Sequence, residues 1–370
     1  MRLFILLLLL SSCFSSSKLS FNGKGNISFK EVSYNDLENW SEVNHKKALQ
    51  SFNHSCNKFA KMPQNKLVGG QIGSIFIKDF RDVCDIADVV RTMDSKQAKN
   101  FFENWFRPLK VATRSGKSKG LFTGYYEASL KGNMRKTDKY RYPIYKVPND
   151  LTYEPYYSRQ EIESGVLSSK GLEILYVDNI VDLFFLHIQG SGRVELPDGS
   201  NVRISYAGRN NHPYTSIGGY MVDKGYISAD HVNAKTIMKW LNENPIKAIE
   251  VMNQNAAYTF FELSKNEYVV GAQNVPLTAM HSIAIDNDYI PYGLPIWVET
   301  HLKDSNKNEV KFNNLLIAQD TGSAIRGAVR GDIFFGFGKV AQDNASYMAS
   351  KGEYYLLIPV NIVDNLRKNN

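Results

Sequence analysis

Hydrophobic positions divide the chain into a helical beginning and a strand-rich remainder. Apolar side chains recur at helical spacing through residues 48–59 and again through residues 80–90, which predicts two amphipathic helices. Ser95 precedes a third such pattern that ends at Trp105, and serine is a favoured helix N-cap. The aromatic stripes on these predicted helices indicate a buried core rather than a ligand site.

From about residue 119 onwards, runs rich in β-branched and aromatic residues alternate with turn residues, which predicts strands. Pro197-Asp198-Gly199 is typical of a hairpin turn. Ser158 and Glu161 have the spacing of a capping box for a short helix. The predicted strands cover residues 120–130, 140–147, 173–189 and 194–205, and further strands fill the chain from residue 258 to its end.

Helical spacing returns only around residues 215–254, with a second helix of that group after Pro245. The whole pattern is therefore β-barrel-like, with helices at the start and around residues 215–254. The roughly 340 residues that follow the N-terminal segment suffice for two domains or one large one.

The first residues are typical of an exported lipoprotein. Arg2 precedes an apolar run, Leu3–Leu10, which is too short to span a bilayer and fits a signal-peptide core. The following Ser-Ser-Cys segment ends at Cys13 and is similar to a bacterial lipobox; the alternative is an ordinary signal peptide with an incidental cysteine. Acyl chains on Cys13 would anchor the protein to a membrane, with residues 14–39 as the predicted tether.

Two more cysteines, Cys56 and Cys84, would form a disulfide in an oxidising compartment or remain as two buried thiols. No C-x-x-C or H-E-x-x-H spacing occurs, so we expect no metal site. The net charge of +7 suits an anionic polymer or a membrane surface. Nucleic acid is not an expected partner, because no basic run is interleaved with aromatic residues.

The most informative stretch lies between two acids near the end of the chain. An apolar run ends at Asp320, a glycine-rich loop with Arg326 and Arg330 follows, and Asp332 opens a short aromatic segment. Carboxylates on loops between strands commonly form bond-cleaving sites, and the alternative is a solvated surface turn. An arginine beside either acid would lower the pKa of that acid.

Four other segments combine hydroxyls, amides and aromatic rings with glycines, a mixture that suits sugar recognition. Any one of them alone is more often a tight β-turn. They cover residues 122–127, 187–193, 205–214 and 274–286.

Taken together and in this order, the motifs resemble those of membrane-bound lytic murein transglycosylases of the A type. The resemblance runs from about residue 40 to 360 and rests on the segments Thr-Gly-Tyr-Tyr-Glu, Gln-Gly-Ser-Gly, Ser-Tyr-Ala-Gly, Val-Pro-Leu-Thr and Asp-Thr-Gly…Gly-Asp-Ile-Phe-Phe-Gly. It implies a mainly β fold with N-terminal helices. A double-psi β-barrel domain formed by residues 40–126 and 249–370 would hold a smaller inserted β-barrel domain, residues 127–248, with a substrate groove between them.

The resemblance also implies the site. Asp332 matches a single catalytic aspartate, and Asp320 matches a second acid that lines the same site. Thr123, Tyr125, Gln189, Ser191 and Tyr206 fall on positions expected to contact sugar. No cofactor is implied.

The implied partners are peptidoglycan glycan strands, a membrane through the lipid anchor, and proteins of cell-wall synthesis or division. The implied location is the outer membrane, facing the periplasm; Phe14 after Cys13 agrees with it by analogy.

The implied reaction needs one acid, which protonates the glycosidic oxygen and then takes a proton from the C6 hydroxyl of the sugar. That hydroxyl attacks C1 and forms a 1,6-anhydro end without water, so no second catalytic carboxylate is required, unlike in an ordinary glycosidase. The acid must be protonated when substrate binds, which requires a raised pKa.

Some residues depart from the family pattern or fit other classes. Met280-His281 stands where the family pattern has Gly-Arg, which puts substrate preference in doubt, and Ser323 replaces a glycine. Asp320-Thr321-Gly322 resembles an aspartic-protease motif, but the chain has no second copy. A non-catalytic peptidoglycan-binding lipoprotein and a hydrolytic muramidase are the remaining alternatives.

Overall fold

The computed structural model describes residues 18–303 and 308–369. The predicted signal peptide and Cys13 lie outside these residues. Within them, no helix is long and apolar enough to cross a membrane. No cluster of three or more histidine, cysteine, aspartate or glutamate side chains in the same residues could hold a metal ion.

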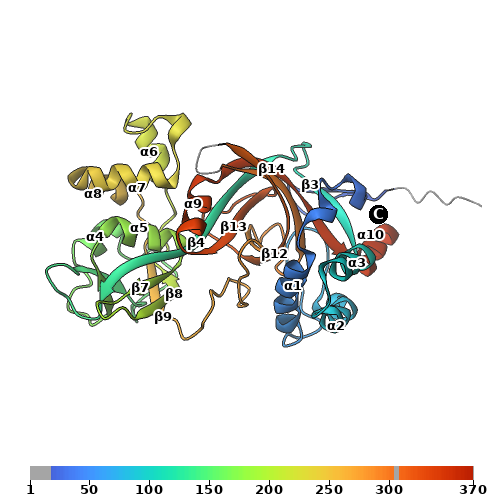
Figure 1. The fold of residues 1–370 in the computed structure, drawn as a ribbon, viewed down its shortest axis with the longest axis horizontal. Coiled ribbons are helices and arrows are strands. Elements are labelled where there is room, and N and C mark those ends of the chain that lie inside the picture. Colours follow the sequence, from blue (N-terminus) through green and yellow to red (C-terminus); the bar gives the residue numbers. More distant parts are fainter. Residues whose placement is uncertain (1–17, 304–307, 370) are drawn as a thin grey trace, which may run out of the picture.

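The centre of the molecule is a ring of strands (Figure 1). β4 pairs in parallel with β13, β13 pairs with β10, and the pairing continues through β12, β11 and β14 before β14 closes the ring on β4. Fully buried Ile296, Leu316 and Leu356 are in register on β11, β12 and β14, so they share one face of these strands, and each such side chain contributes about 1.5–3 kcal/mol by leaving water. These strands are β4 (Gly120–Asn133), β10 (Ser282–Ile285), β11 (Pro295–Lys303), β12 (Glu309–Asp320), β13 (Arg330–Phe337) and β14 (Ala349–Pro359).

The three predicted N-terminal helices are confirmed and pack beside this ring. They are α1 (His45–Phe59), α2 (Arg81–Val90) and α3 (Ser95–Trp105). Asp94 rather than Ser95 caps α3, because its carboxylate accepts a hydrogen bond from the backbone N–H of Gln97. Cys56 of α1 and Cys84 of α2 form a disulfide with their Cα atoms 5.3 Å apart.

The predicted tether is partly folded. β1 (Ser20–Asn22) and β2 (Ser28–Glu31) form a hairpin, and β2 pairs with β3 (Phe106–Ala112), which pairs with β14. Ile27 and Phe29 are buried, so this part of the predicted tether belongs to the core, which its polar composition concealed.

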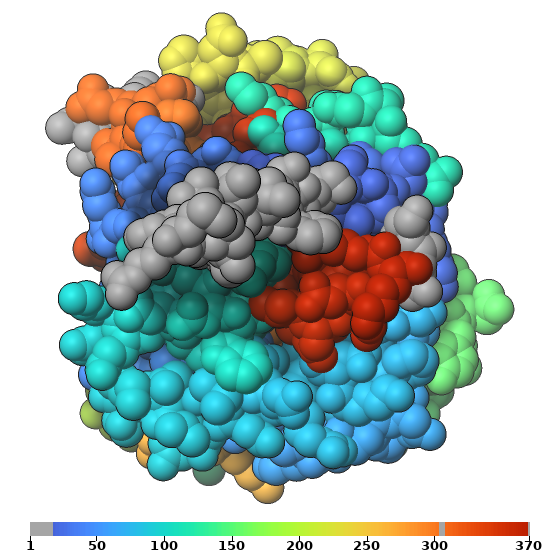
Figure 2. All heavy atoms as spheres, turned by 90° about the vertical axis from the view of Figure 1, so that its right-hand side faces the viewer, coloured from blue at the N-terminus to red at the C-terminus, as the bar shows by residue number. Residues whose placement is uncertain are grey.

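The two ends of the described chain meet on one face. Arg367 of α10 (Val360–Asn369) donates hydrogen bonds to both carboxylate oxygens of Glu31, at 2.6 and 2.7 Å. Figure 2 shows this face, with α10 in red against segments from the first third of the chain.

β4 continues beyond the ring into a second group of elements, at the left of Figure 1. There it pairs with β7 and β6, and β8 and β9 extend the sheet from β7. Because β9 pairs with β8, this part reaches residue 263, and the predicted boundary at residue 248 cuts through α8. The group contains β5 (Tyr142–Tyr145), α4 (Arg159–Glu163), β6 (Glu173–Val177), α5 (Ile180–Gln189), β7 (Ser191–Glu195), β8 (Asn201–Arg209), α6 (Ile217–Asp223), α7 (Ala234–Glu243), α8 (Pro245–Asn253) and β9 (Thr259–Leu263).

Two strand predictions were wrong. Residues 173–189 divide into β6 and α5, and Asn179 caps the helix by accepting hydrogen bonds from the N–H groups of Val181 and Asp182. Seven of the ten residues of α5 are apolar, so its sequence has no alternation that separates a buried strand from a buried helix. Near the end of the chain, α9 (Lys339–Tyr347) and α10 are helices where strands were predicted.

Short 3-10 turns complete the described chain. They are Tyr34–Asp36, Trp40–Glu42, Ile77–Phe80 and Ala229–His231.

Candidate active site

Thr123 and Asp332 face each other across the parallel pair of β4 and β13, in direct register. The Thr123 hydroxyl donates a hydrogen bond of 2.6 Å to Oδ1 of Asp332, and it accepts one of 2.8 Å from Nη2 of Arg330. Arg330 therefore reaches the acid through the threonine. Among the described residues, no group donates a hydrogen bond to Oδ2 of Asp332.

Tyr125 brings the second acid to the same place. It lies two residues beyond Thr123 on β4, so the two side chains point to the same face of the strand. The Tyr125 hydroxyl donates a hydrogen bond of 2.7 Å to Oδ2 of Asp320. The backbone N–H groups of Ala272 and Thr321 both donate to Oδ1 of Asp320 at 2.9 Å. Three donors thus hold the Asp320 carboxylate in one orientation.

Ala284 separates the two acids. This residue of β10 is in register with Asp320 on one neighbouring strand and with Asp332 on the other. Two strand spacings put the two Cα atoms roughly 10 Å apart. The side chain of Ala284 is buried in a cluster with Tyr125 and Phe334.

Burial dominates the electrostatics of both acids. It raises the pKa of Asp332, and the charge of Asp320 adds to this, whereas the Arg330 guanidinium and the Thr123 hydrogen bond oppose it. Burial likewise raises the pKa of Asp320 against the hydrogen bonds from Tyr125 and the two backbone N–H groups. Of the two loop arginines, Arg330 therefore lowers the pKa of Asp332 as anticipated, but less than burial raises it.

The other predicted sugar contacts lie farther along β4 and on its neighbours. Oε1 of Gln189, the last residue of α5, accepts a hydrogen bond of 3.0 Å from the N–H of Tyr126. Ser191 opens β7 and is buried, and Tyr206 on β8 is 54% exposed. Within the described residues, none of these three side chains hydrogen-bonds either acid.

One residue within electrostatic reach of Asp332 had no named role in the sequence prediction. Tyr214 belongs to the segment 205–214 that was singled out for its composition. Its pKa is raised mainly by burial and additionally by the charge of Asp332, so its hydroxyl lies within electrostatic reach of the acid. The backbone donor of Ala272 was also missed, because any residue type can supply a backbone N–H.

His281 does not reach the acids. It is buried, and its Nδ1 lies 3.0 Å from the carbonyl oxygen of Leu315. The histidine in place of the expected arginine therefore supports a strand rather than contacting a carboxylate.

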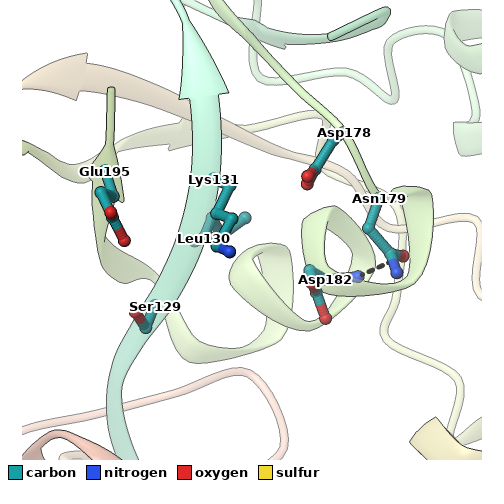
Figure 3. A pocket seen from close by; sticks show the side chains of 7 residues that line it. All are labelled: Ser129, Leu130, Lys131, Asp178, Asn179, Asp182 and Glu195. Atoms are coloured by element: carbon teal, nitrogen blue, oxygen red, sulfur yellow. Dashed lines mark hydrogen bonds between the residues drawn. The ribbon is translucent and has the colours of Figure 1, made fainter. Parts of the chain in front are cut away.

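A separate cavity of about 330 Å³ lies at the far end of β4 (Figure 3). Burial and the neighbouring Asp178 raise the pKa of Asp182 there to about 6. None of the predicted site residues lines this cavity, so it is distinct from the paired acids. Its lining consists of Ser129, Leu130, Lys131, Asp178, Asn179, Asp182 and Glu195.

Comparisons with known proteins agree with the two parts of the fold. Residues 121–262 match the MltA specific insert domain, and residues 281–358 match the 3D domain. The membrane-bound lytic murein transglycosylase A of Escherichia coli K12 is 34% identical over 243 residues, which are 64% of this chain and 65% of that protein. The matched region thus spans about 65% of the length of this curated relative.

Two solved structures resemble most of the chain. MltA from Neisseria gonorrhoeae is 33% identical with a TM-score of 0.74, over 92% of this chain and 94% of that one. Escherichia coli MltA with bound chitohexaose is 26% identical with a TM-score of 0.71, over 86% of this chain and 90% of that one.

Proposed function

The chain belongs to the MltA family of membrane-bound lytic murein transglycosylases, and from this premise we propose that it cleaves the glycan strands of peptidoglycan. The bond cleaved is the β-1,4 linkage between N-acetylmuramic acid and N-acetylglucosamine. The observation that carries this proposal is Asp332, which has a raised pKa, a hydrogen bond from Thr123 and an oxygen available to substrate.

Asp332 acts first as the acid and then as the base. Its proton goes to the glycosidic oxygen, and the resulting carboxylate takes the proton of the C6 hydroxyl as that oxygen attacks C1. The product is a 1,6-anhydro-muramic acid end, and water takes no part. Burial favours the protonated form of Asp332 before the reaction, and Arg330 stabilises the carboxylate formed during it.

Asp320 supports the site as a fixed hydrogen-bond acceptor. Its two oxygens already accept hydrogen bonds from Tyr125, Ala272 and Thr321, which leaves only one of about four acceptor positions for a water molecule. This arrangement favours a single-acid reaction over hydrolysis with two carboxylates.

The glycan strand lies in a groove between a double-psi β-barrel, formed by the ring, and the inserted part. Thr123 and Tyr125 contact sugar from the ring side. Gln189, Ser191 and Tyr206 contact it from the inserted part, where the exposed ring of Tyr206 can cover the apolar face of a sugar.

The test is a digest of purified peptidoglycan, with product masses read by mass spectrometry. We expect fragments lighter by one water than hydrolysis products, and we expect Asp332→Asn to abolish them while strand binding remains. Asp364→Asn, at a surface carboxylate that is 49% exposed, is the control and should cleave normally. Products that contain the added water would instead favour a hydrolase with Asp320 as its second carboxylate. Binding without cleavage would favour a non-catalytic envelope protein.

The protein acts from a membrane. Acyl chains on Cys13 hold it on the outer membrane facing the periplasm, where peptidoglycan and proteins of cell-wall synthesis or division are within reach. Membrane fractionation of Cys13→Ser tests this placement, because loss of the acyl chains should release the protein into the soluble fraction. Retention of the variant in the membrane would contradict a lipid anchor at Cys13.

A further inference from the structure

The loop between the two acids carries two arginines with different surroundings. Nη2 of Arg330 donates to Thr123 at 2.8 Å, and its Nη1 donates to the carbonyl oxygens of Leu121, at 3.2 Å, and Gly331. The Arg330 guanidinium is therefore already bonded to Thr123 and to the backbone of β4 and β13. The side chain of Arg326 is 55% exposed, and its ion pair with Asp286 spans 3.5 Å, at the outer limit of a hydrogen bond.

The backbone around Arg326 is held firmly at the rim of the site. Ile325 is buried in a cluster that includes Tyr125 and Phe334, whose rings lie next to the acids. Gly327 donates its N–H to Oδ2 of the buried Asp286 at 2.7 Å. Arg326 thus projects from a fixed backbone between two anchored residues.

Arg326 lies close to the acid site. Its Nη1 is 3.5 Å from Oδ1 of Asp286, and Asp286 follows two residues after Ala284, which is in register with both acids. The charges of Asp320 and Arg326 also act in opposite directions on the pKa of one tyrosine, Tyr292, which burial raises to about 12.

We propose that Arg326 is a specificity residue that binds a carboxylate on the glycan strand next to the cleaved bond. This proposal rests on the proposed function and names the chemical group of the substrate that Arg326 recognises. Every muramic acid of a murein strand carries a lactyl group, whose carboxyl is a free carboxylate or is amide-linked to a peptide with carboxylates of its own, whereas chitohexaose carries no carboxylate. A guanidinium binds carboxylates through two parallel N–H donors, and a partner at 3.5 Å leaves these donors free to engage a ligand.

The test measures binding with the full chain carrying Asp332→Asn, so that the strands stay intact. The ligands are peptide-free murein strands, the same strands with their carboxylates converted to neutral methylamides, and chitohexaose. Arg326→Gln should weaken binding of the unmodified, carboxylate-bearing strands roughly fivefold to tenfold. It should leave binding of both neutral ligands, the methylamide strands and chitohexaose, unchanged. Arg326→Lys should retain part of the preference, because the charge remains and the planar fork is lost.

The matched control is Arg91→Gln. Arg91 is 60% exposed and pairs with Asp88 at 2.6 Å on α2, so its replacement removes a similar surface charge away from the acids. The control should bind all three ligands like the parent. Equal weakening of all three ligands by Arg326→Gln would mean that Arg326 only shapes the loop, and unchanged binding of native strands would also overturn the proposal.

Cleavage by the chain with Asp332 intact is followed in parallel. If that chain cleaves strands to anhydro products but Arg326→Gln weakens binding of the carboxylate-bearing strands no more than binding of the neutral ligands, this inference fails and the proposed function stands. If the intact chain neither binds nor cleaves native strands, the proposed function fails.

Discussion

At the scale of single residues, the hydroxyl of Thr123 controls how readily Asp332 gives up its proton. The hydrogen bond from Thr123 lowers the pKa of Asp332, so its removal raises that pKa. Thr123→Val should lower kcat about tenfold to a hundredfold and move the basic limb of the pH–rate profile to higher pH. Thr123→Ser, which keeps the hydroxyl, should stay close to the parent in both. A profile that does not move in Thr123→Val would show that the hydroxyl does not tune the acid.

Asp332 also makes a measurable contribution to stability. Burial raises its folded pKa above the ordinary value of 3.8, so the folded state binds the proton more tightly than the unfolded chain. The stability linked to this proton is fully present below the ordinary pKa and is lost as pH rises through the folded pKa. At neutral pH the charged carboxylate therefore destabilises the fold.

We accordingly expect Asp332→Asn to raise the Tm at pH 7, with a gain that shrinks as pH falls towards about 4. Thermal unfolding across this pH range checks it, with Asp364→Asn as the exposed comparison. If the Tm gain of Asp332→Asn instead grew as pH fell, the pKa of Asp332 would not be raised in the folded state.

At the scale of elements, a buried carboxylate joins three strands where β4 leaves the ring. Glu127 on β4 is 2% exposed and pairs with Arg193 of β7 at 2.9 Å and with Arg203 of β8 at 2.7 Å. Glu127→Ala should reduce the free energy of unfolding by about 3–5 kcal/mol, because it leaves two guanidinium groups without their buried partner. Chemical denaturation measures the loss.

An exposed ion pair offers the matched comparison. Asp88 on α2 is 64% exposed and pairs with Arg91 at 2.6 Å. Asp88→Ala should cost at most about 1 kcal/mol, because solvent screens such a pair. Equal losses of unfolding free energy in Glu127→Ala and Asp88→Ala would show that burial does not determine how much these ion pairs contribute.

The disulfide links two further elements. Cys56 and Cys84 close a loop with a sequence separation of 28 between α1 and α2. Replacing both cysteines with serine should lower the free energy of unfolding by roughly 3–4 kcal/mol, mainly because the unfolded chain regains freedom. Reductant should lower the Tm of the parent but not of the double variant. A parent insensitive to reductant would indicate that the bond contributes little.

At the scale of the whole molecule, β4 unites the ring, the acid site and the inserted part. Gly124 lies between Thr123 and Tyr125, and a Cβ there would be 2.8 Å from Cα of Ala345 in α9 and 2.5 Å from the Phe335 ring. Gly124→Ala should therefore push α9 from β4, cost about 1–3 kcal/mol and reduce cleavage. Its control is Gly219→Ala in α6, where a Cβ meets no atom within 4 Å and alanine should stabilise the helix. Normal stability and activity in Gly124→Ala would show that α9 adapts to the methyl group.

The sequence alone determined those features that depend on neighbours along the chain. Helical spacing identified α1 and α2, and the capping box of Ser158 and Glu161 identified α4. The order of the motifs selected Asp332, Thr123 and Tyr125 as candidates. The apolar run of α5 was ambiguous, because a mostly buried apolar segment lacks the alternation that distinguishes a strand from a helix.

Only the tertiary structure decided which of these residues meet. Thr123 and Asp332 are 209 positions apart, and the parallel pairing of β4 with β13 brings them within 2.6 Å. The same folding brings the donors Tyr125 and Ala272 to Asp320, sets Arg330 against Thr123 and buries His281. The reason is physical: a pKa and a hydrogen bond depend on the solvent and groups around a side chain in space, and strands distant in sequence supply those groups.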